Sequence, residues 1–94
     1  MPLSVRGTPR FDRLARKLLS GHPELPGIQE RARVILEVDP QNRTRRYHIK
    51  KLEGVAQGKG QYRLSLGRWR FRYDIYGQEV ALQYVGLRRE ETYR

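Results

Sequence analysis

Arginine side chains recur along residues 61–74 with the alternation that is typical of a β-strand. Alternate side chains of a strand point to opposite faces of a sheet, which separates the tyrosines and leucines of this segment from its cations. The cations are Arg63, Arg68, Arg70 and Arg72. Neighbouring like charges on one exposed face cost about a few tenths of a kcal/mol per pair. We therefore expect this face to contact phosphate; the alternative is a solvated face whose charges serve solubility.

A second cationic cluster lies within residues 85–94. Arg88 and Arg89 follow a strand-like segment that reaches Gly86, and Tyr93 stands close behind them. Guanidinium groups beside a phenol favour its ionised form and make proton transfer feasible. The alternative is that Tyr93 only anchors a frayed tail to the core.

The two histidines are weaker candidates. His48 is an alternative base on a strand that also carries Lys50 and Lys51, but a lone strand histidine is more often structural or solvated. His22 is expected to be a turn residue, and Trp69 is expected in the core rather than stacked on a base. Two histidines, no cysteine and scattered carboxylates give no metal-ligand spacing. We expect no metal and no cofactor.

The charge of the chain is large and uneven. Twenty Lys and Arg against ten Asp and Glu give a formal charge of +10, and sixteen of the twenty cations are Arg. Residues 43–94 hold thirteen cations and five anions, a net of +8. Guanidinium pairs bidentately with phosphate and stacks on bases, so the composition favours a nucleic acid partner. A membrane surface is disfavoured, because the basic residues fall in strand-like segments rather than on an amphipathic helix.

The 94 residues are expected to form a single domain, 1–94, because a chain of this length closes one hydrophobic core. The absence of cysteine excludes disulfides and thiol nucleophiles. No apolar stretch near the N-terminus has the length of a signal peptide or a membrane span, so we expect a cytoplasmic location.

The elements that must position these side chains are two helices followed by strands. Thr8 and Pro9 start a helix whose apolar stripe begins at Phe11, and a second helix spans 24–38. The short link between them predicts an antiparallel helix pair. Periodicity predicts strands at 47–52, 62–66, 69–75 and 79–85, with a weak edge strand at 2–6. The expected fold class is α+β, with two N-terminal helices packed on a largely antiparallel sheet of four or five strands.

Three segments together resemble the RelE/ParE toxin superfamily. His48–Gly54 is similar to its Leu-x-Gly segment, Gln61–Tyr73 to its central hairpin, and Val85–Tyr93 to its VGHRxxVY ending. The segments occur in the family's order and spacing, and the two preceding helices also fit. The resemblance spans essentially the whole chain and implies a RelE-like fold.

The resemblance also implies roles for residues at matching positions. Arg70 matches the hairpin arginine that contacts the scissile phosphate, Arg88 the arginine after the last strand, and Tyr93 the C-terminal tyrosine. Ser65 and Leu87 occupy positions where relatives often carry a proton-transfer group, so those two roles are empty here. The implied catalytic set is Arg63, Arg70, Arg88 and Tyr93. The expected RNA-binding set is Lys50, Lys51, Arg68, Arg72 and Arg89.

As a whole, the resemblance implies the toxin of a type II toxin–antitoxin system. Such a toxin is a ribosome-dependent, metal-independent endoribonuclease that cleaves mRNA by attack of a 2′-hydroxyl on the adjacent phosphate. Its expected partners are mRNA in the ribosome, with contacts to 16S rRNA, and a cognate antitoxin that covers the basic cleft. Two alternatives stay open at this point: a ParE-like inhibitor of DNA gyrase and a non-catalytic RNA- or ribosome-binding module.

Overall fold

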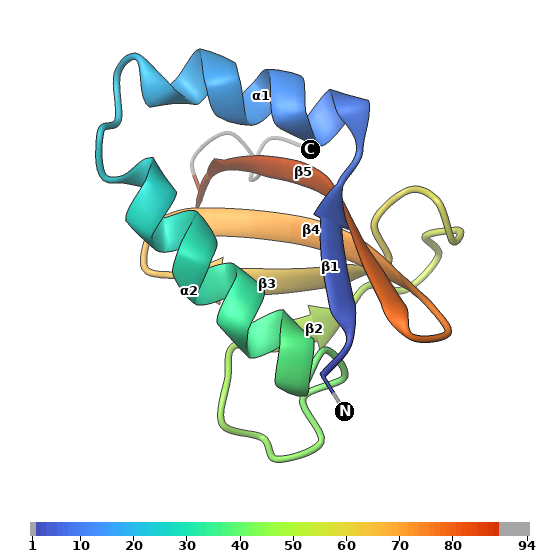
Figure 1. Ribbon diagram of the computed structural model, residues 1–94. Helices are drawn as coiled ribbons and strands as arrows, with labels where there is room; N and C mark the ends of the chain where they lie inside the picture. The colour runs from blue at the N-terminus through green and yellow to red at the C-terminus, as the bar shows by residue number, and fades with distance from the viewer. Residues whose placement is uncertain (1, 89–94) are drawn as a thin grey trace.

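Two helices lie on one side of a five-stranded sheet in the computed structural model, which describes residues 2–88 (Figure 1). The elements in chain order are β1 (Ser4–Gly7), α1 (Pro9–Leu19), α2 (Leu25–Val38), β2 (Ile49–Lys51), β3 (Tyr62–Leu66), β4 (Trp69–Tyr76) and β5 (Glu79–Leu87). The expected α+β class, with N-terminal helices on a largely antiparallel sheet, is confirmed.

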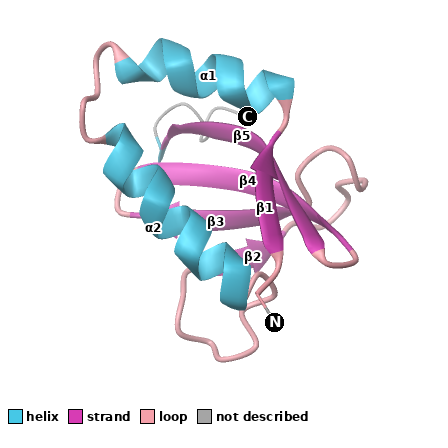
Figure 2. Cartoon of the chain, viewed as in Figure 1, coloured by secondary structure: helices cyan, strands magenta, loops and turns pink. Residues whose placement is uncertain are grey.

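The sheet has the strand order β1-β5-β4-β3-β2 (Figure 2). Strands β2 to β5 pair antiparallel with their neighbours in sequence, as connections through turns allow. The weak edge strand expected near the N-terminus exists as β1, and it pairs parallel with β5. The first and the last strand of the described chain are therefore neighbours.

Helix α1 begins where the sequence predicts. Thr8 has an extended backbone, its hydroxyl oxygen accepts a hydrogen bond from the Phe11 N–H at 3.2 Å, and Pro9 occupies the first turn. Phe11 and Ala15 are buried against the sheet, whereas Leu19 at the end of the apolar stripe is exposed. The stripe is thus only partly internal.

Helix α2 crosses the same side of the sheet as α1. Its buried residues are Leu25, Ala32 and Leu36, each with no exposed surface. Figure 1 shows α1 and α2 diverging from their short connection, so they do not form the antiparallel pair that was expected. The physical reason is that the apolar stripes of both helices pack on the sheet.

Tyr73 ties the sheet to the chain that follows α2. Its ring is fully buried and stacks on Tyr62 with 5.5 Å between the ring centroids, and its hydroxyl donates to the Pro40 carbonyl at 2.6 Å. Burial raises the pKa of Tyr73 well above its ordinary value. This phenol is a structural hydrogen-bond donor in the core.

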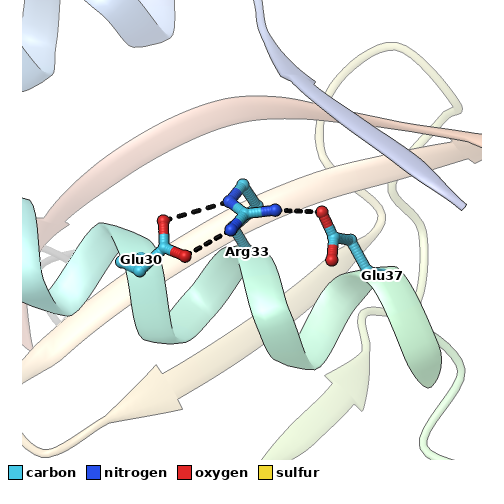
Figure 3. A network of polar contacts seen from close by, with 3 residues as sticks. All are labelled: Glu30, Arg33 and Glu37. Carbon is cyan, nitrogen blue, oxygen red and sulfur yellow. Dashed lines mark hydrogen bonds and ion pairs between the residues drawn. The ribbon is translucent and has the colours of Figure 1, made fainter. Parts of the chain in front are cut away.

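One side of α2 carries a short ion network (Figure 3). The guanidinium of Arg33 bonds both Glu30, one turn before it, and Glu37, one turn after it. Pairs at this spacing contribute little to stability, because water screens their charges. On this side of the molecule a cation is balanced by two carboxylates.

No helix within residues 2–88 combines the length and the apolar character needed to cross a membrane.

Candidate nucleic-acid interface

The face of the sheet that points away from the helices, here called the outer face, carries two rows of side chains. The strands place them opposite the buried core residues Leu64, Phe71 and Val85, because side chains alternate along a strand. Cross-strand register sets the first row as Lys50, Arg63, Arg72 and Tyr84. The second row is His48, Ser65, Arg70 and Gly86.

A β-bulge divides the outer face. The register between β4 and β5 shifts between Arg72 and Tyr73, with the extra residue in β5. Asp74 lies on the outer face, under a loop, because the alternation of β4 continues from Arg72. Asp74 is fully buried, and its carboxylate accepts hydrogen bonds from the N–H groups of Gly60 and Gln61 at 3.0 Å and from the Gln83 side chain at 2.9 Å. The sequence analysis gave Asp74 no role, and the structure makes it the anchor of this loop.

Arg72 holds the same loop from the other side of the bulge. Its guanidinium donates to the carbonyls of Gly60 at 3.1 Å and Lys59 at 3.2 Å. Gly60 has a φ of +85°, and a Cβ there would lie 2.9 Å from Cβ of Arg72, so only glycine fits this approach. The loop 57–61 therefore covers one half of the outer face. Arg72 was expected in the RNA-binding set, but its guanidinium binds this loop.

The other half of the outer face is open and hollowed. A hollow of about 330 Å³ is lined by Tyr47, His48, Ile49, Lys50, Arg63 and Ser65. Beside it, Nη1 of Arg70 donates to the carbonyls of Gly67 at 2.7 Å and Trp69 at 3.0 Å. None of the described residues that the register places on this half is acidic. This half can therefore offer several fixed cations to one anion.

Tyr84 joins this half of the face and was missed in the sequence. It stands opposite Arg72 in the register, and its ring lies over Gly86, where a Cβ would come 2.6 Å from Cζ of Tyr84. Gly86 is the cross-strand partner of Arg70. The phenol thus lies next to the position that faces Arg70. A tyrosine two positions before a glycine on the same strand lies on the same face as the glycine, and this pattern in the sequence could have predicted the arrangement.

Arg68 and Lys51 lie apart from the open half. Arg68 is in the turn after Gly67, where the alternation stops, and Nη2 donates to the Glu24 carboxylate at 3.0 Å. A hydrogen bond from the backbone N–H of Glu24, and then that from Arg68, lower the pKa of Glu24 below its ordinary value. Lys51 places Nζ 5.7 Å from the ring centre of Tyr62, on the helix side of the sheet. The expectation that Arg68 shares a face with Arg70 is wrong.

The remaining predicted residues lie around the end of β5. Arg88 has an exposed side chain directly after this strand, and its N–H donates to the Arg68 carbonyl at 2.7 Å. Arg89 and Tyr93 lie outside the described residues, so the structure places neither of them. The described members that share the open half are Arg63, Arg70 and Lys50.

The other conspicuous side chains have structural surroundings. Trp69 is buried, as expected, and meets His22 edge-on with 5.3 Å between the ring centres. His22 lies 3.7 Å from the Glu24 carboxylate, at the junction of the two helices. Across residues 2–88, no three His, Cys, Asp or Glu side chains gather in a group that could hold a metal ion.

Asp39 organises the basic loop that leads into β2. Its buried carboxylate accepts hydrogen bonds from the N–H groups of Arg43 and Thr44 and from the Thr44 hydroxyl, at 2.7, 3.1 and 2.6 Å. Desolvation alone would raise the pKa of Asp39, but these hydrogen bonds outweigh it and lower the pKa below its ordinary value. No role was predicted for Asp39, which directly follows the helix predicted at 24–38.

Comparisons with known proteins bear on the fold. No family model matches the sequence, and no curated protein matches it. A solved structure of the toxin–antitoxin complex RelBE2 from Mycobacterium tuberculosis contains a similar chain, with 24% identity and a TM-score of 0.71 over 94% of this chain and 100% of that chain. The chain has a RelE-like fold.

A second solved structure, of the archaeal RelE–RelB complex from Pyrococcus horikoshii OT3, contains a chain with the same arrangement. It has 16% identity and a TM-score of 0.63, over 94% of this chain and 97% of that chain. The RelE-like fold implied by the three sequence segments is therefore confirmed, and it includes the strands that build the outer face.

Proposed function

We propose that this protein is the toxin of a type II toxin–antitoxin system and cleaves mRNA on the ribosome. The observation that carries the proposal is the open half of the outer face. Arg63 and Lys50 line a hollow there, Arg70 is the cross-strand partner of Ser65 in its lining, and the strands contribute no acidic side chain. The RelE-like fold, shared with chains of two toxin–antitoxin complexes, supports it.

The reaction is attack of the ribose 2′-oxygen on the adjacent phosphate, with loss of the 5′-oxygen. The phosphorane that forms carries two negative charges, and donors fixed in advance stabilise such a charge best. Two backbone carbonyls hold the guanidinium of Arg70, so it does not have to be ordered when the substrate binds. In this proposal Arg63, Arg70 and Arg88 stabilise the phosphorane, and the products are a 2′,3′-cyclic phosphate and a 5′-hydroxyl.

Positioning supplies much of the remaining rate. Guanidinium is a poor base at neutral pH, because its ordinary pKa lies above 12, roughly. A folded ribosomal site that aligns the 2′-oxygen with the leaving group removes much of the entropic barrier. Dependence on the ribosome, and contacts with 16S rRNA by Lys50, Arg68 and Arg89, follow from this proposal.

A cell that makes such a toxin needs an inhibitor. We propose a cognate antitoxin with acidic groups that covers the open half of the outer face, because complementary charge gives fast and specific association. The proposal treats residues 1–94 as one domain that acts in the cytoplasm, where ribosomes and mRNA are present.

The test uses induced expression of the protein and of two single variants, Arg70→Ala and Arg72→Ala. Primer extension on translated transcripts is expected to show cuts in the ribosomal A site for the wild-type chain. Arg70→Ala is expected to abolish both the cuts and the growth arrest, because it removes a donor to the phosphorane. Arg72→Ala is the matched control, since Arg72 donates to loop carbonyls instead; cuts should persist at a level that follows the amount of folded protein.

Intact transcripts together with growth arrest by the wild-type chain would overturn the proposal. A DNA-damage response under those conditions would indicate a gyrase inhibitor instead. Ribosome association without cuts would indicate a non-catalytic binding module.

A further inference from the structure

We propose that His48 is the general base that removes the proton from the 2′-hydroxyl; this inference rests on the proposed function. The arginines of the proposed site stabilise charge but do not accept a proton at neutral pH, so the reaction needs a separate base.

The backbone places His48 beside Ser65, whose side chain is small. His48 immediately precedes β2, and its carbonyl accepts a hydrogen bond from the Ser65 N–H at 2.9 Å. Ser65 in turn pairs with Arg70. The three residues therefore lie in one row across neighbouring strands, and two strand spacings separate His48 from Arg70 by about 10 Å. A ribose and its phosphate fit into such a span above the small serine.

The side chain of His48 lines the hollow in company with the cations. It is exposed, and it borders the hollow together with Lys50 and Arg63. A phosphodiester in this hollow would meet a cation from each of two strands, which fixes its phosphate. The ribose attached to that phosphate then comes within reach of the imidazole.

The chemistry of the neighbouring side chains singles out imidazole as the base. Guanidinium, ammonium and phenol have ordinary pKa values of about 10 or more, so at neutral pH they donate protons rather than accept them. Imidazole has an ordinary pKa of about 6.5 and accepts a proton near neutrality. Within residues 2–88, His48 is the histidine on the outer face, whereas His22 lies in the helix layer against Trp69.

The step balances without an oxidant or a metal. The imidazole takes the proton of the 2′-hydroxyl as the 2′-oxygen forms its bond to phosphorus. The bond from phosphorus to the 5′-oxygen breaks, and this oxygen takes a proton from solvent water. The imidazolium then returns its proton to the resulting hydroxide, which restores both the base and the water.

The experiment measures single-turnover cleavage of mRNA in programmed ribosomes, with the full chain in excess. His48→Gln keeps the size and a polar group but cannot act as the base, and it is expected to slow cleavage at least a hundredfold. Binding to the same ribosomes should change by less than threefold. His22→Gln removes the other histidine and is the matched control, with an expected rate within threefold of wild type once its folded fraction is measured by circular dichroism.

Two further measurements separate a base from a binding or structural residue. Free imidazole is expected to restore part of the rate of His48→Ala and none of the rate of Arg70→Ala. A substrate with sulfur in place of the 5′-oxygen has a leaving group that needs no proton. His48→Gln should stay slow on this substrate, because loss of a base is not repaired by a better leaving group.

Three results would overturn the inference: a wild-type rate in His48→Gln at saturation, a defect confined to ribosome binding, or full recovery with the sulfur substrate. The last would make His48 the acid. In each of them the wild-type chain still cleaves mRNA, so the proposed function stands. Absence of cleavage by the wild-type chain removes the proposed function and this inference together.

Discussion

The two halves of the outer face carry the same kind of side chain in different surroundings. In the covered half, Arg72 donates to two loop carbonyls, and Asp74 is buried under the same loop with three donors. In the open half, Arg63 and Lys50 border a hollow, and Arg70, the cross-strand partner of Ser65, is held by two backbone carbonyls. The comparison shows that alternating arginines on a strand do not by themselves mark a binding surface. Their use depends on whether a nearby loop and carboxylate occupy them.

The largest expected effect lies in the covered half. Asp74→Ala leaves one buried donor and two partly buried donors without their acceptor and is expected to lower the free energy of unfolding by about 3 kcal/mol. Urea denaturation measures the change. Glu53→Ala removes an exposed carboxylate from the neighbouring loop and should stay within about 0.5 kcal/mol of wild type. Equal losses for the two variants would mean that Asp74 is not the anchor of the loop.

Two glycines separate backbone strain from crowding in the same half. Gly60→Ala is expected to cost about 2 kcal/mol, because φ is +85° and the new Cβ would press on Arg72. Gly58→Ala also has a positive φ, of +99°, but its Cβ meets only the Tyr76 hydroxyl at 3.8 Å, so about 1 kcal/mol is expected. Thermal unfolding compares them. A difference that persists in the Arg72→Gly background, which lacks the crowded Cβ, would contradict the role of crowding.

The basic loop before β2 provides a pH-dependent test at the edge of the open half. Asp39→Asn is expected to lower the free energy of unfolding by about 1 kcal/mol at neutral pH, because hydrogen bonds to the carboxylate weaken. The folded-state pKa of Asp39 lies below its ordinary 3.8, so the stabilisation is complete above that value and disappears as pH falls through the lowered pKa.

The difference in the free energy of unfolding between Asp39→Asn and the wild-type chain should therefore become smaller in acid. Urea denaturation at a series of pH values measures it. Glu53→Gln, in an exposed loop, is the control for loss of a negative charge. A gap that stays constant across the acid range would refute the assignment.

The smallest expected effect distinguishes two adjacent lysines. Lys50 lies on the outer face with Arg63, whereas Lys51 lies on the opposite side over Tyr62. With single-stranded RNA, Lys50→Gln is expected to weaken binding about two- to threefold and to lower the slope of log affinity against log salt by about 0.7. Lys51→Gln should leave the slope unchanged. Equal slopes for the two variants would mean that RNA does not discriminate between the two faces.

Local signals in the sequence predicted most of the elements. The Thr8–Pro9 start and the apolar stripe from Phe11 define α1, and alternation defines β3 and β4. The cations Arg63 and Arg70 lie on the outer face as this alternation requires. These features depend on residues a few positions apart, which a sequence displays directly.

The features that were not predicted depend on distant contacts. The loop 57–61 folds over Arg72 and Asp74 because of hydrogen bonds that no periodicity encodes. The bulge at Arg72 and Tyr73 adds one residue to the partner strand and leaves the pattern of β4 intact. Arg68 does not lie in the row of Arg63, Arg70 and Arg72 that was predicted. It is in a turn, where its side chain bonds Glu24, a residue far away in the sequence.

The parallel pairing of β1 with β5 has a consequence for synthesis of the chain. Strand β5 lies between β1 and β4, so the sheet stays incomplete until residues 79–87 have emerged from the translating ribosome. Contacts between such distant segments pay their loop-closure entropy late and make folding slower than in a domain with local contacts. A nascent chain that stops before β5 lacks the strand that carries Tyr84 and Gly86, and it cannot assemble the outer face. The outer face therefore forms only after residues 79–87 have been synthesised.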